Sequence, residues 1–519
     1  MQLEAFANAL LPKLAWVAKV DQLRGFVTLQ HGAGVEVRPM FFIEGVWNAP
    51  FQKGEFGDTD CVFGTGGILT EESIRFVSSA STTDYLYYVA EGKHVMVSNS
   101  LPLLLASVED ALNTRYEEYA LICHSILDGI NDYRRDIPTK RGMVRRLMYR
   151  NLDVSRDHLS ERDKLMPPRF ACFKEYRDYL RDRYALIATN ARDGARKQPL
   201  EIVSTQSKGY DSTAVNAIAA PHGINKVFTV SHAKSNSHLA HHELDTLPDD
   251  DGGDICAVFG IPCIRLNRQA FVEEFDDEYL YYCALHLTQD ANLKDIRNHV
   301  SQVSLLLTGT LGEIWYPRST LGAKAFLDED LRRWDLGGHG MAEWRLVVGL
   351  IHLPMPYIGA RRKPDIVAIT ESFEMDPWRM GRAYDRPIPR RIAEEAGIPR
   401  DAFGQSKMGS VVLFSAPSIP YGQALRREFF QSLADERILS RFAARLWPVV
   451  RWVNSMLLLK SSSRFAGVYY TERLVAKLIG RDFHFSLLWS HLEGALFCFC
   501  VNRTAKAYSQ HLSVLNNAE

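Results

Sequence analysis

The sequence predicts a mixed α/β protein in which a β-rich first part precedes a parallel sheet covered by helices. Short β-branched and aromatic runs, separated by glycine and aspartate turns, occupy the first hundred residues. From about residue 199, strand-like runs alternate with helix-like stretches, which is typical of a parallel sheet. The length of 519 residues exceeds the usual size of one domain, so two or more domains are expected.

The composition is that of a globular protein, with 46% hydrophobic and 24% charged residues. A net charge of −1 gives no electrostatic argument for binding nucleic acid or an anionic membrane. No apolar run approaches the roughly 20 residues that span a bilayer, and no basic and apolar leader follows Met1. The eight cysteines form no paired CxxC set, which argues against zinc and suits a reducing compartment. We therefore expect a cytoplasmic protein, with a homodimer left open.

In the first part, strands are expected at 25–30, 35–37, 40–43, 85–89 and 94–97. The glycine cluster Gly64–Gly67 favours a hairpin turn over a phosphate loop, because it lacks a strand-to-helix context. Residues 101–112 are predicted to be helical. The charged stretch from Asn131 to Arg146 is predicted to be a solvated connection.

A boundary is expected near Met166-Pro-Pro168, which divides the chain into domains 1–165 and 166–519. A long helix over 173–196 opens the second domain. Its predicted strands are 200–203, 227–230, 263–266 and 304–307, with helical segments at 213–220 and before 261. The remainder is expected to be mainly helical, including a C-terminal region over about 420–519.

The loop Ser207-Lys-Gly-Tyr-Asp-Ser212 lies between a predicted strand and a predicted helix. Gly209 lets the backbone approach an anion closely, and the N–H groups and dipole of the following helix favour phosphate. Ser207 and Ser212 add hydroxyl donors, and Lys208 adds a positive charge. A carboxylate beside phosphates is repulsive unless a cation lies between them, so Asp211 is predicted to be a magnesium ligand. The alternative is a turn capped by Asp or Ser.

A second turn, Thr308-Gly-Thr-Leu-Gly-Glu313, follows the predicted strand 304–307. In an open parallel sheet, ligands bind at the carboxyl ends of strands, so the two turns are expected to meet. Glu313 would then complete a cation site with Asp211. Together the turns predict a site for ATP and Mg²⁺.

These features resemble the synthetase domain of asparagine synthetases and their relatives, the β-lactam synthetases and lasso-peptide cyclases. The segment Asp251–Gly260 is similar to the helix before the third strand of those enzymes. Tyr384 to Lys407 resembles their C-terminal loop with its essential lysine, and Val97–Ala106 resembles the end of their glutaminase-like domain. The resemblance extends to about residue 415 and is specific at the 207–212 loop.

The resemblance implies an Ntn-type, glutaminase-like α+β domain in 1–165 and an adenine nucleotide alpha-hydrolase-like (PP-loop) synthetase domain in 166–519. It implies that pyrophosphate and magnesium are held by Ser207, Gly209, Asp211 and Ser212. The adenine and ribose side would be lined by Val230, Thr308 and Gly309. Glu313 stands where the family has a magnesium-binding aspartate, and Lys407 would stabilise negative charge that develops during reaction.

Three positions depart from the family. Lys208 replaces a glycine, so it either contacts phosphate or restricts the loop. Thr310 replaces a glutamate or tyrosine, and a hydroxyl is a poor base near neutral pH. Glu343 is a candidate base by spacing, with a solvated helix position as the alternative. Gln2 replaces the nucleophilic cysteine that glutamine-dependent members expose after Met1 removal, so glutamine hydrolysis is not expected.

The sequence therefore predicts an ATP-dependent ligase that activates a carboxylate as an acyl-adenylate, releases pyrophosphate, and forms an amide with an amine. Magnesium at Asp211 and Glu313 would neutralise the leaving group. The expected substrates are a small-molecule or peptide carboxylate and an amine, in specialised biosynthesis. Two alternatives stay open: a PP-loop enzyme that adenylates a nucleobase or nucleotide, and a degenerate nucleotide- or partner-binding protein, which Lys208 and Thr310 would permit.

Overall fold

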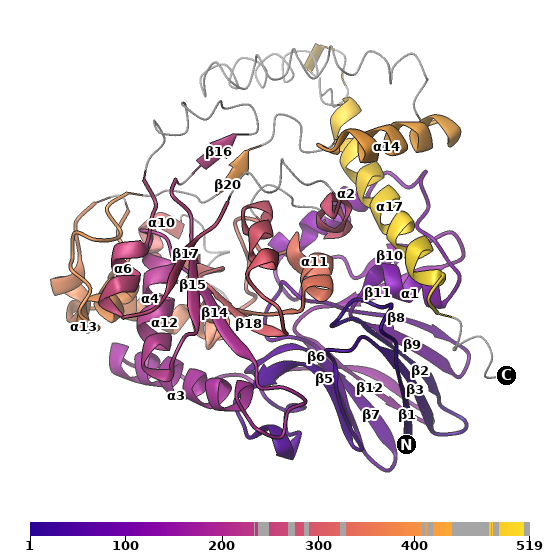
Figure 1. Ribbon diagram of the computed structural model, residues 1–519, viewed down its shortest axis with the longest axis horizontal. Coiled ribbons are helices and arrows are strands. Elements are labelled where there is room, and N and C mark those ends of the chain that lie inside the picture. Colours follow the sequence, from indigo (N-terminus) through magenta and orange to yellow (C-terminus); the bar gives the residue numbers. More distant parts are fainter. Residues whose placement is uncertain are drawn as a thin grey trace.

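The structure is a computed structural model that describes residues 1–232, 234–236, 249–267, 276–284, 290–321, 329–382, 384–406, 411–413, 419–438, 477–478, 480 and 487–512. Two large, mainly antiparallel sheets occupy the first part of the chain, and a five-stranded parallel sheet follows (Figure 1). The predicted mixed α/β class is confirmed.

The first sheet has seven strands, and all of its pairs are antiparallel except β1 with β3. Its spatial order is β1 (Gln2–Ala7), β3 (Phe26–His31), β2 (Trp16–Asp21), β9 (His94–Ser98), β8 (Leu86–Glu91), β11 (Met143–Leu147) and β10 (Asp136–Pro138).

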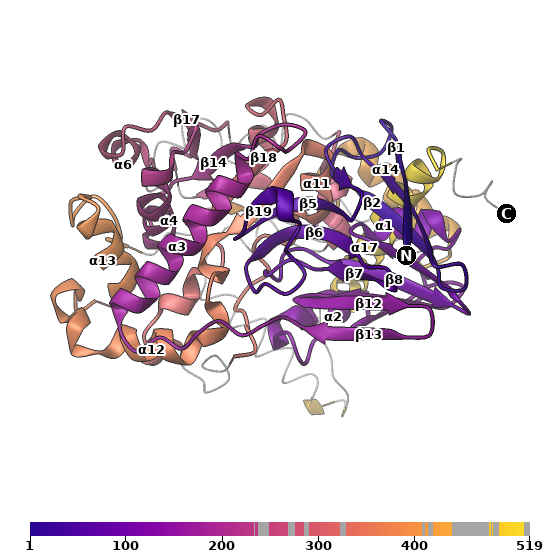
Figure 2. The same cartoon turned by 90° about the horizontal axis from the view of Figure 1, so that it is seen from below.

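The second sheet has six strands and is antiparallel throughout. Its order is β13 (Leu159–Asp163), β12 (Arg150–Ser155), β7 (Ser73–Val77), β6 (Val62–Leu69), β5 (Phe41–Trp47) and β4 (Glu36–Arg38). The two sheets share one apolar core, in which the Trp16 ring lies 5.0 Å from Phe42 and 6.0 Å from Phe76. They therefore pack face to face (Figure 2).

The hairpin turn predicted at Gly64–Gly67 is wrong, because these glycines lie within β6. Their role is close approach of neighbouring backbone. A Cβ on Gly64, whose φ is +98°, would lie 1.9 Å from the Glu44 carbonyl oxygen, and one on Gly66 would lie 2.2 Å from that of Phe42. Side chains at these positions would push β6 away from β5.

The solvated connection predicted from Asn131 to Arg146 is also wrong in part, because it contains β10 and most of β11. Ile137 and Val144 are buried, and so is Arg146, whose guanidinium lies over the Tyr85 and Tyr133 rings. The many charged residues of the segment favoured a solvated connection, although its apolar residues alternate as in a strand.

The parallel sheet has the order β17 (Cys263–Arg265), β15 (Lys226–Thr229), β14 (Glu201–Thr205), β18 (Ser304–Thr308) and β19 (Leu350–Pro354). The four predicted strands are present, and β19 is an addition that the sequence reading missed. Leu305 and Leu307 belong to the core shared with α3 (Phe173–Ala191) and α4 (Tyr210–Ala219), whereas Leu306 belongs to the core on the other face. Helices thus cover both faces, as predicted.

The other described helices are short except at the C-terminal end of the chain. They are α1 (Leu101–Ser107), α2 (Tyr119–His124), α6 (Gly253–Val258), α8 (Glu278–Tyr281), α10 (Arg318–Leu321), α11 (Met341–Val348), α12 (Lys363–Glu371), α13 (Pro387–Glu395), α14 (Gln423–Asp435) and α17 (Leu487–Ser509). A two-stranded parallel pair joins β16 (Lys234–Asn236) to β20 (Val411–Leu413). None of the helices in the described ranges has the length and apolar character that crossing a bilayer requires.

Helix α17 returns to the first part of the chain and packs beside α1 and α2 (Figure 1). Cys498 and Cys500 lie on it as buried free thiols, as predicted. A further apolar cluster contains Leu14 and Val17 of the first part together with Ile202 and Leu305 of the parallel sheet. The two parts of the chain therefore share a continuous core.

Candidate active site

The candidate site is a cavity of about 540 Å³ at the carboxyl ends of β14, β15 and β18. Strand β14 lies between β15 and β18. After β14 the chain forms β15 and β17 on one side of it, and then crosses to form β18 and β19 on the other side. This is the topological switch point, where open parallel sheets bind ligands. The turns after β14 and β18 both line the cavity, as the sequence predicted.

The turn after β14 ends at Gly209, which is the N-cap residue of α4. Its hydroxyl groups are organised toward the helix start: Ser207 Oγ lies 3.1 Å from Ser212 Oγ and accepts a 3.1 Å hydrogen bond from the Gly209 N–H. The first N–H groups of a helix have no partner within the helix. The turn therefore gathers backbone and hydroxyl donors at one end of the cavity.

Gln206 fixes this turn from below. Its buried amide nitrogen donates to Thr213 Oγ1 at 2.9 Å and to the Ser207 carbonyl at 2.6 Å. A Cβ on Gly252, the residue before α6, would lie 2.3 Å from Gln206 Cγ, so only glycine lets this neighbouring segment pack so closely. The loop is thus supported by two elements outside the 207–212 motif.

Asp211 lies in the first turn of α4 and meets the turn after β18. A Cβ on Gly312 would lie 2.1 Å from Asp211 Cγ, and one on Gly309 would lie 2.7 Å from Asp211 Cβ. Both glycines are therefore needed for this contact. Leu311 between them has a φ of +72°, a conformation that a non-glycine side chain rarely adopts.

Arg386 is the partner of Asp211, a contact that the sequence did not predict. Its guanidinium forms an ion pair with the Asp211 carboxylate, donates to the Gly312 carbonyl at 3.2 Å, and lies 3.8 Å from the centre of the Tyr316 ring. Arg386 is 1% exposed. Burial lowers its pKa, but Asp211, Tyr384 and Tyr316 outweigh that effect and raise it above the usual value. A permanent positive charge therefore lies at the end of the cavity that Asp211 lines.

Glu313 lines the same cavity as Asp211, as predicted. Its Oε1 is buried without a hydrogen-bond partner. Burial raises the pKa of this carboxyl above its ordinary value, and the charge of Arg333 only partly opposes that effect. A buried acceptor oxygen with no partner, on a residue that lines the cavity, is the chemistry that a cation or a donor on a ligand would satisfy.

Val230, Thr308 and Gly309 also line the cavity, as predicted for the adenine and ribose side. Apolar side chains line this region with Val230, namely Phe228, Leu266, Leu293 and Met341. An apolar slot next to hydrogen-bonding groups is typical of sites for planar ligands.

Asp290 is a cavity residue that sequence reasoning missed. Its two oxygens accept hydrogen bonds from the Gly338 and Gly340 N–H groups at 2.8 and 2.7 Å. Burial raises the pKa of Asp290 to about 7, although these hydrogen bonds lower it. No motif surrounds Asp290 in the sequence, so only the fold reveals that it fixes the segment before α11.

Lys208 does not line the cavity, contrary to its predicted contact with the nucleotide. Its ammonium group forms an ion pair with Asp249, and its backbone N–H donates to Asp250 Oδ1 at 2.9 Å. The acidic run 249–251 after β15 attracts the charge away from the cavity. Lys208 therefore holds one loop against another.

Glu343 also lies outside the cavity lining, so the structure does not bring it to the predicted position of a base. Its oxygens accept hydrogen bonds from the Ser100 hydroxyl at 2.9 and 3.0 Å and from the Tyr508 hydroxyl at 2.8 Å. It is neither at the site nor on a solvated helix face, because it is buried between Ser100, the N-cap residue of α1, and Tyr508 of α17.

Lys407, the predicted stabiliser of developing charge, lies outside the described residues. The described part of its segment reaches Ser406, and the Gly404 N–H donates to the Lys208 carbonyl at 2.8 Å. Tyr384, from the same part of the chain, lines the cavity. The segment before Lys407 therefore lies against the loop after β14.

Across the described ranges, no cluster of three or more histidine, cysteine, aspartate or glutamate side chains has the arrangement of a metal site. Four acidic residues line the cavity, namely Asp211, Asp290, Glu313 and Asp335. No protein-family model matches the chain, and no curated protein matches it significantly.

Proposed function

We propose that this protein is an ATP-dependent carbon–nitrogen ligase of the asparagine synthetase type, which forms AMP and pyrophosphate. The observation that supports this most strongly is the cavity at the switch point of the parallel sheet, where the Ser207–Ser212 loop meets the Thr308–Glu313 turn. The arrangement has donors for phosphate at one end and an apolar slot at the other.

In the first step, a substrate carboxylate oxygen bonds to the α-phosphorus of ATP. The bond between the α-phosphorus and the oxygen that bridges it to the β-phosphorus breaks, and pyrophosphate leaves. The N–H groups at the start of α4 and the hydroxyls of Ser207 and Ser212 bind the phosphates that leave. Arg386 supplies a positive charge beside them. In the second step, an amine nitrogen bonds to the acyl carbon, AMP leaves with the electron pair of its C–O bond, and the nitrogen loses a proton.

The cavity residues fit a magnesium ion in their donor chemistry. Asp211 and Glu313 both line the cavity, and Glu313 Oε1 is buried without a partner. Magnesium is commonly held by one or two carboxylates together with substrate phosphates. When bound, the ion supplies neutralisation of the pyrophosphate charge, and Asp211 would share its carboxylate between the ion and Arg386.

We assign the two face-to-face sheets of the first part to a glutaminase-like, Ntn-type domain that has lost its nucleophile. Gln2 occupies the position of the reactive cysteine and lies in β1, where its backbone N–H donates to the Gly25 carbonyl. The amine would therefore reach the cavity as a substrate. We propose a small-molecule or peptide carboxylate and amine in specialised biosynthesis, in the cytoplasm.

One observation favours a second candidate, a nucleotide-binding protein without catalysis. The ion pair with Arg386 already neutralises the Asp211 carboxylate. In the neighbouring turn, Leu311 has a left-handed backbone conformation. A site built in this way could bind the phosphates of a nucleotide without magnesium and without turnover.

Exchange of radiolabelled pyrophosphate into ATP distinguishes these candidates. With the proteinogenic amino acids supplied singly as carboxylates, we expect exchange that depends on one carboxylate and falls at least tenfold in Asp211→Asn. Asp157→Asn is the matched control, because Asp157 lies on the surface with its side chain 96% exposed. Tight ATP binding with no exchange for any carboxylate would favour the second candidate.

A further inference from the structure

A largely buried run of hydroxyl groups and one histidine begins at the lining of the cavity. Thr310 and Thr308 line the cavity, and their Oγ1 atoms lie 3.0 Å apart. Thr308 Oγ1 lies 2.8 Å from His352 Nε2, and His352 Nδ1 lies 3.4 Å from Thr83 Oγ1, the longest step of the run. His352 comes from β19, so this run passes from the parallel sheet into the first part of the chain.

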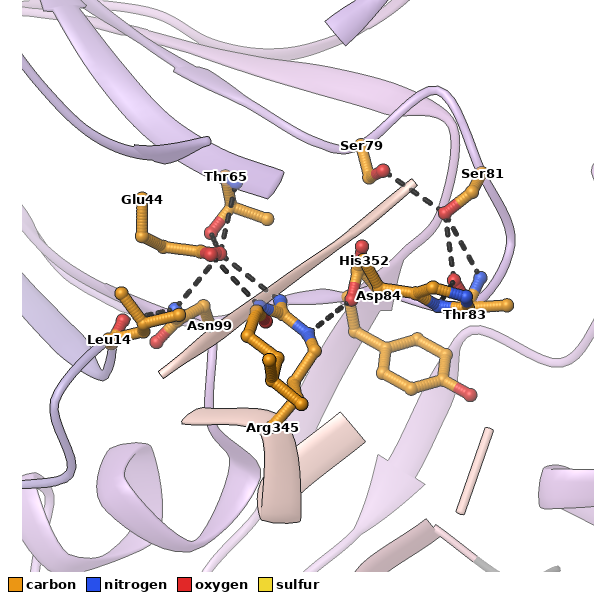
Figure 3. A network of polar contacts seen from close by, with 12 residues as sticks. Leu14, Glu44, Thr65, Ser79, Ser81, Thr83, Asp84, Asn99, Arg345 and His352 are labelled. Carbon is orange, nitrogen blue, oxygen red and sulfur yellow. Dashed lines mark hydrogen bonds and ion pairs between the residues drawn. The ribbon is translucent and has the colours of Figure 1, made fainter. Parts of the chain in front are cut away.

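Beyond Thr83, the run continues along the loop between β7 and β8. Thr83 Oγ1 lies 2.9 Å from Ser81 Oγ, which lies 3.0 Å from Ser79 Oγ. All three hydroxyls are buried, and in each of these contacts either oxygen can be the donor. Figure 3 shows the part of this run from His352 through Thr83 and Ser81 to Ser79, together with Asp84 and the Arg345 guanidinium. The Ser79 hydroxyl donates a hydrogen bond to Asp84, which lowers the pKa of that carboxyl, so Ser79 lies at the carboxylate end of the run.

Asp84 belongs to a buried cluster that has one positive and two negative groups. Arg345 forms ion pairs with Glu44 at 2.9 Å and with Asp84 at 2.6 Å. Glu44 is well satisfied, because it also accepts hydrogen bonds from the Thr65 N–H, the Thr65 hydroxyl and the Asn99 amide at 3.0, 2.8 and 3.3 Å. Asp84 has fewer donors, namely the Arg345 guanidinium and the Ser79 hydroxyl. A proton entering the cluster therefore has its acceptor at Asp84.

We propose that the run Thr310–Thr308–His352–Thr83–Ser81–Ser79 relays the proton of the attacking amine from the cavity to Asp84. This proposal rests on the proposed ligase function. It supplies the base that Thr310 lacks, since a hydroxyl can pass a proton on although it holds one poorly.

The proton count of the relay balances. When the nitrogen–carbon bond has formed, the nitrogen gives its proton to Thr310 Oγ1, whose own proton moves to Thr308 Oγ1. Thr308 gives its proton to His352 Nε2, and His352 releases the one on Nδ1 to Thr83. Thr83, Ser81 and Ser79 each accept one proton and pass their own on to the next group, and Asp84 becomes neutral. The reverse shifts return the proton to the cavity after the products leave.

His352 suits a relay because it changes tautomer without acquiring net charge. Burial, followed by the charges of Arg345 and Arg333, lowers the pKa of His352 to about 3, so the ring is neutral at physiological pH. Burial raises the pKa of Asp84 to about 6, with Arg345 lowering it and Glu44 raising it. Tyr85 is the other titratable neighbour, and its pKa lies far above neutrality because of burial.

The test compares two half-reactions in the full-length protein. Thr83→Val removes one hydroxyl from the middle of the run, and Asp84→Asn removes the acceptor. Thr370→Val is the matched control, because the Thr370 hydroxyl is equally buried but donates to the Ile366 carbonyl of its own helix. Pyrophosphate exchange with amino acids reports adenylation, and single-turnover amide formation with ammonia reports the proton-releasing step.

We expect Thr83→Val and Asp84→Asn to lower amide formation at least tenfold while exchange stays within about twofold of the wild type. With the concentration of neutral ammonia held constant at each pH, amide formation by the wild type should also decline below about pH 6, and Asp84→Asn should lose that decline. Equal losses of exchange and amide formation, or no loss of either, would overturn the relay.

A spectroscopic measurement keeps the relay testable without any substrate. Infrared difference spectra of the unliganded protein should show a buried carboxyl that titrates near pH 6 and is missing in Asp84→Asn. If Asp84 stays ionised from about pH 5 to pH 8, the run has no acceptor and the relay is wrong. If the wild type shows no exchange with any amino acid, the ligase function fails instead, and the spectra alone decide whether Asp84 can accept a proton.

Discussion

At the scale of single residues, Glu343 illustrates how burial changes what a carboxyl does. Burial raises its pKa from 4.5 to about 7, and hydrogen bonds from Tyr508 and Ser100 and the charge of Arg345 only partly oppose this. The folded protein then binds a proton that the unfolded chain has already lost above about pH 4.5. The stability that Glu343 contributes therefore decreases as pH rises from there to about 7.

Glu343→Gln tests this effect, because glutamine keeps an acceptor for Tyr508 but cannot ionise. A pKa shift from 4.5 to about 7 corresponds to roughly 3 kcal/mol. The free energy of unfolding of the wild type should fall as pH rises from about 5 to 8. In the variant we expect this fall to be smaller, by up to that amount. Urea unfolding at both pH values measures it, with Asp157→Asn as the exposed control. Equal losses in wild type and variant would contradict the assignment.

At the scale of elements, the turn between β14 and α4 has two sides with different tasks. Ser207, Gly209 and Ser212 face the cavity, whereas Lys208 contacts the acidic run 249–251 that leads into α6. Lys208 therefore joins two loops and does not line the cavity.

Lys208→Ala should consequently have little effect on the affinity for ATP. Ion pairs between exposed groups contribute about 0–1 kcal/mol, and here the lysine side chain is 30% exposed and that of Asp249 60%. We expect the dissociation constant for ATP to change by less than about threefold, or roughly 0.65 kcal/mol. Calorimetric titration measures it, and Lys93→Ala, which removes another exposed lysine, is the control. A tenfold weaker affinity would mean that Lys208 reaches the phosphates.

The sequence predicted those elements whose pattern is local. Strands β14, β15, β17 and β18 are apolar runs next to helical segments, and the turns after β14 and β18 meet as expected. Strands β10 and β11 were missed because charged residues conceal Ile137 and Val144.

The parts of the site that the sequence did not reveal come from distant segments. Arg386 reaches Asp211 across 175 residues, and Asp290 holds the Gly338 N–H across 48. Such contacts depend on how helices and loops pack, and a single sequence has no local signal for them. The same holds for His352, which is read from the sequence only as one residue of an apolar stretch.

At the scale of the whole molecule, the two parts of the chain form one core and one polar network. Leu14 and Val17 share a cluster with Ile202, and Arg345 of α11 forms ion pairs with Glu44 and Asp84 of the first part. The cavity belongs to the parallel sheet, but Thr83 of the first part lies directly behind it: a Cβ on the cavity residue Gly338 would lie 2.8 Å from Thr83 Cγ2. The first part therefore supports the site even without a nucleophile at Gln2.

The proposed ligase forms an acyl-adenylate in this cavity. The most direct test uses a carboxylate substrate labelled with heavy oxygen and follows the label by mass spectrometry after turnover of ATP. We predict that one labelled oxygen appears in the phosphate of AMP, because the carboxylate oxygen that attacks the α-phosphorus stays there when the amide forms. Release of ADP and phosphate, or AMP without label, would show that no acyl-adenylate forms.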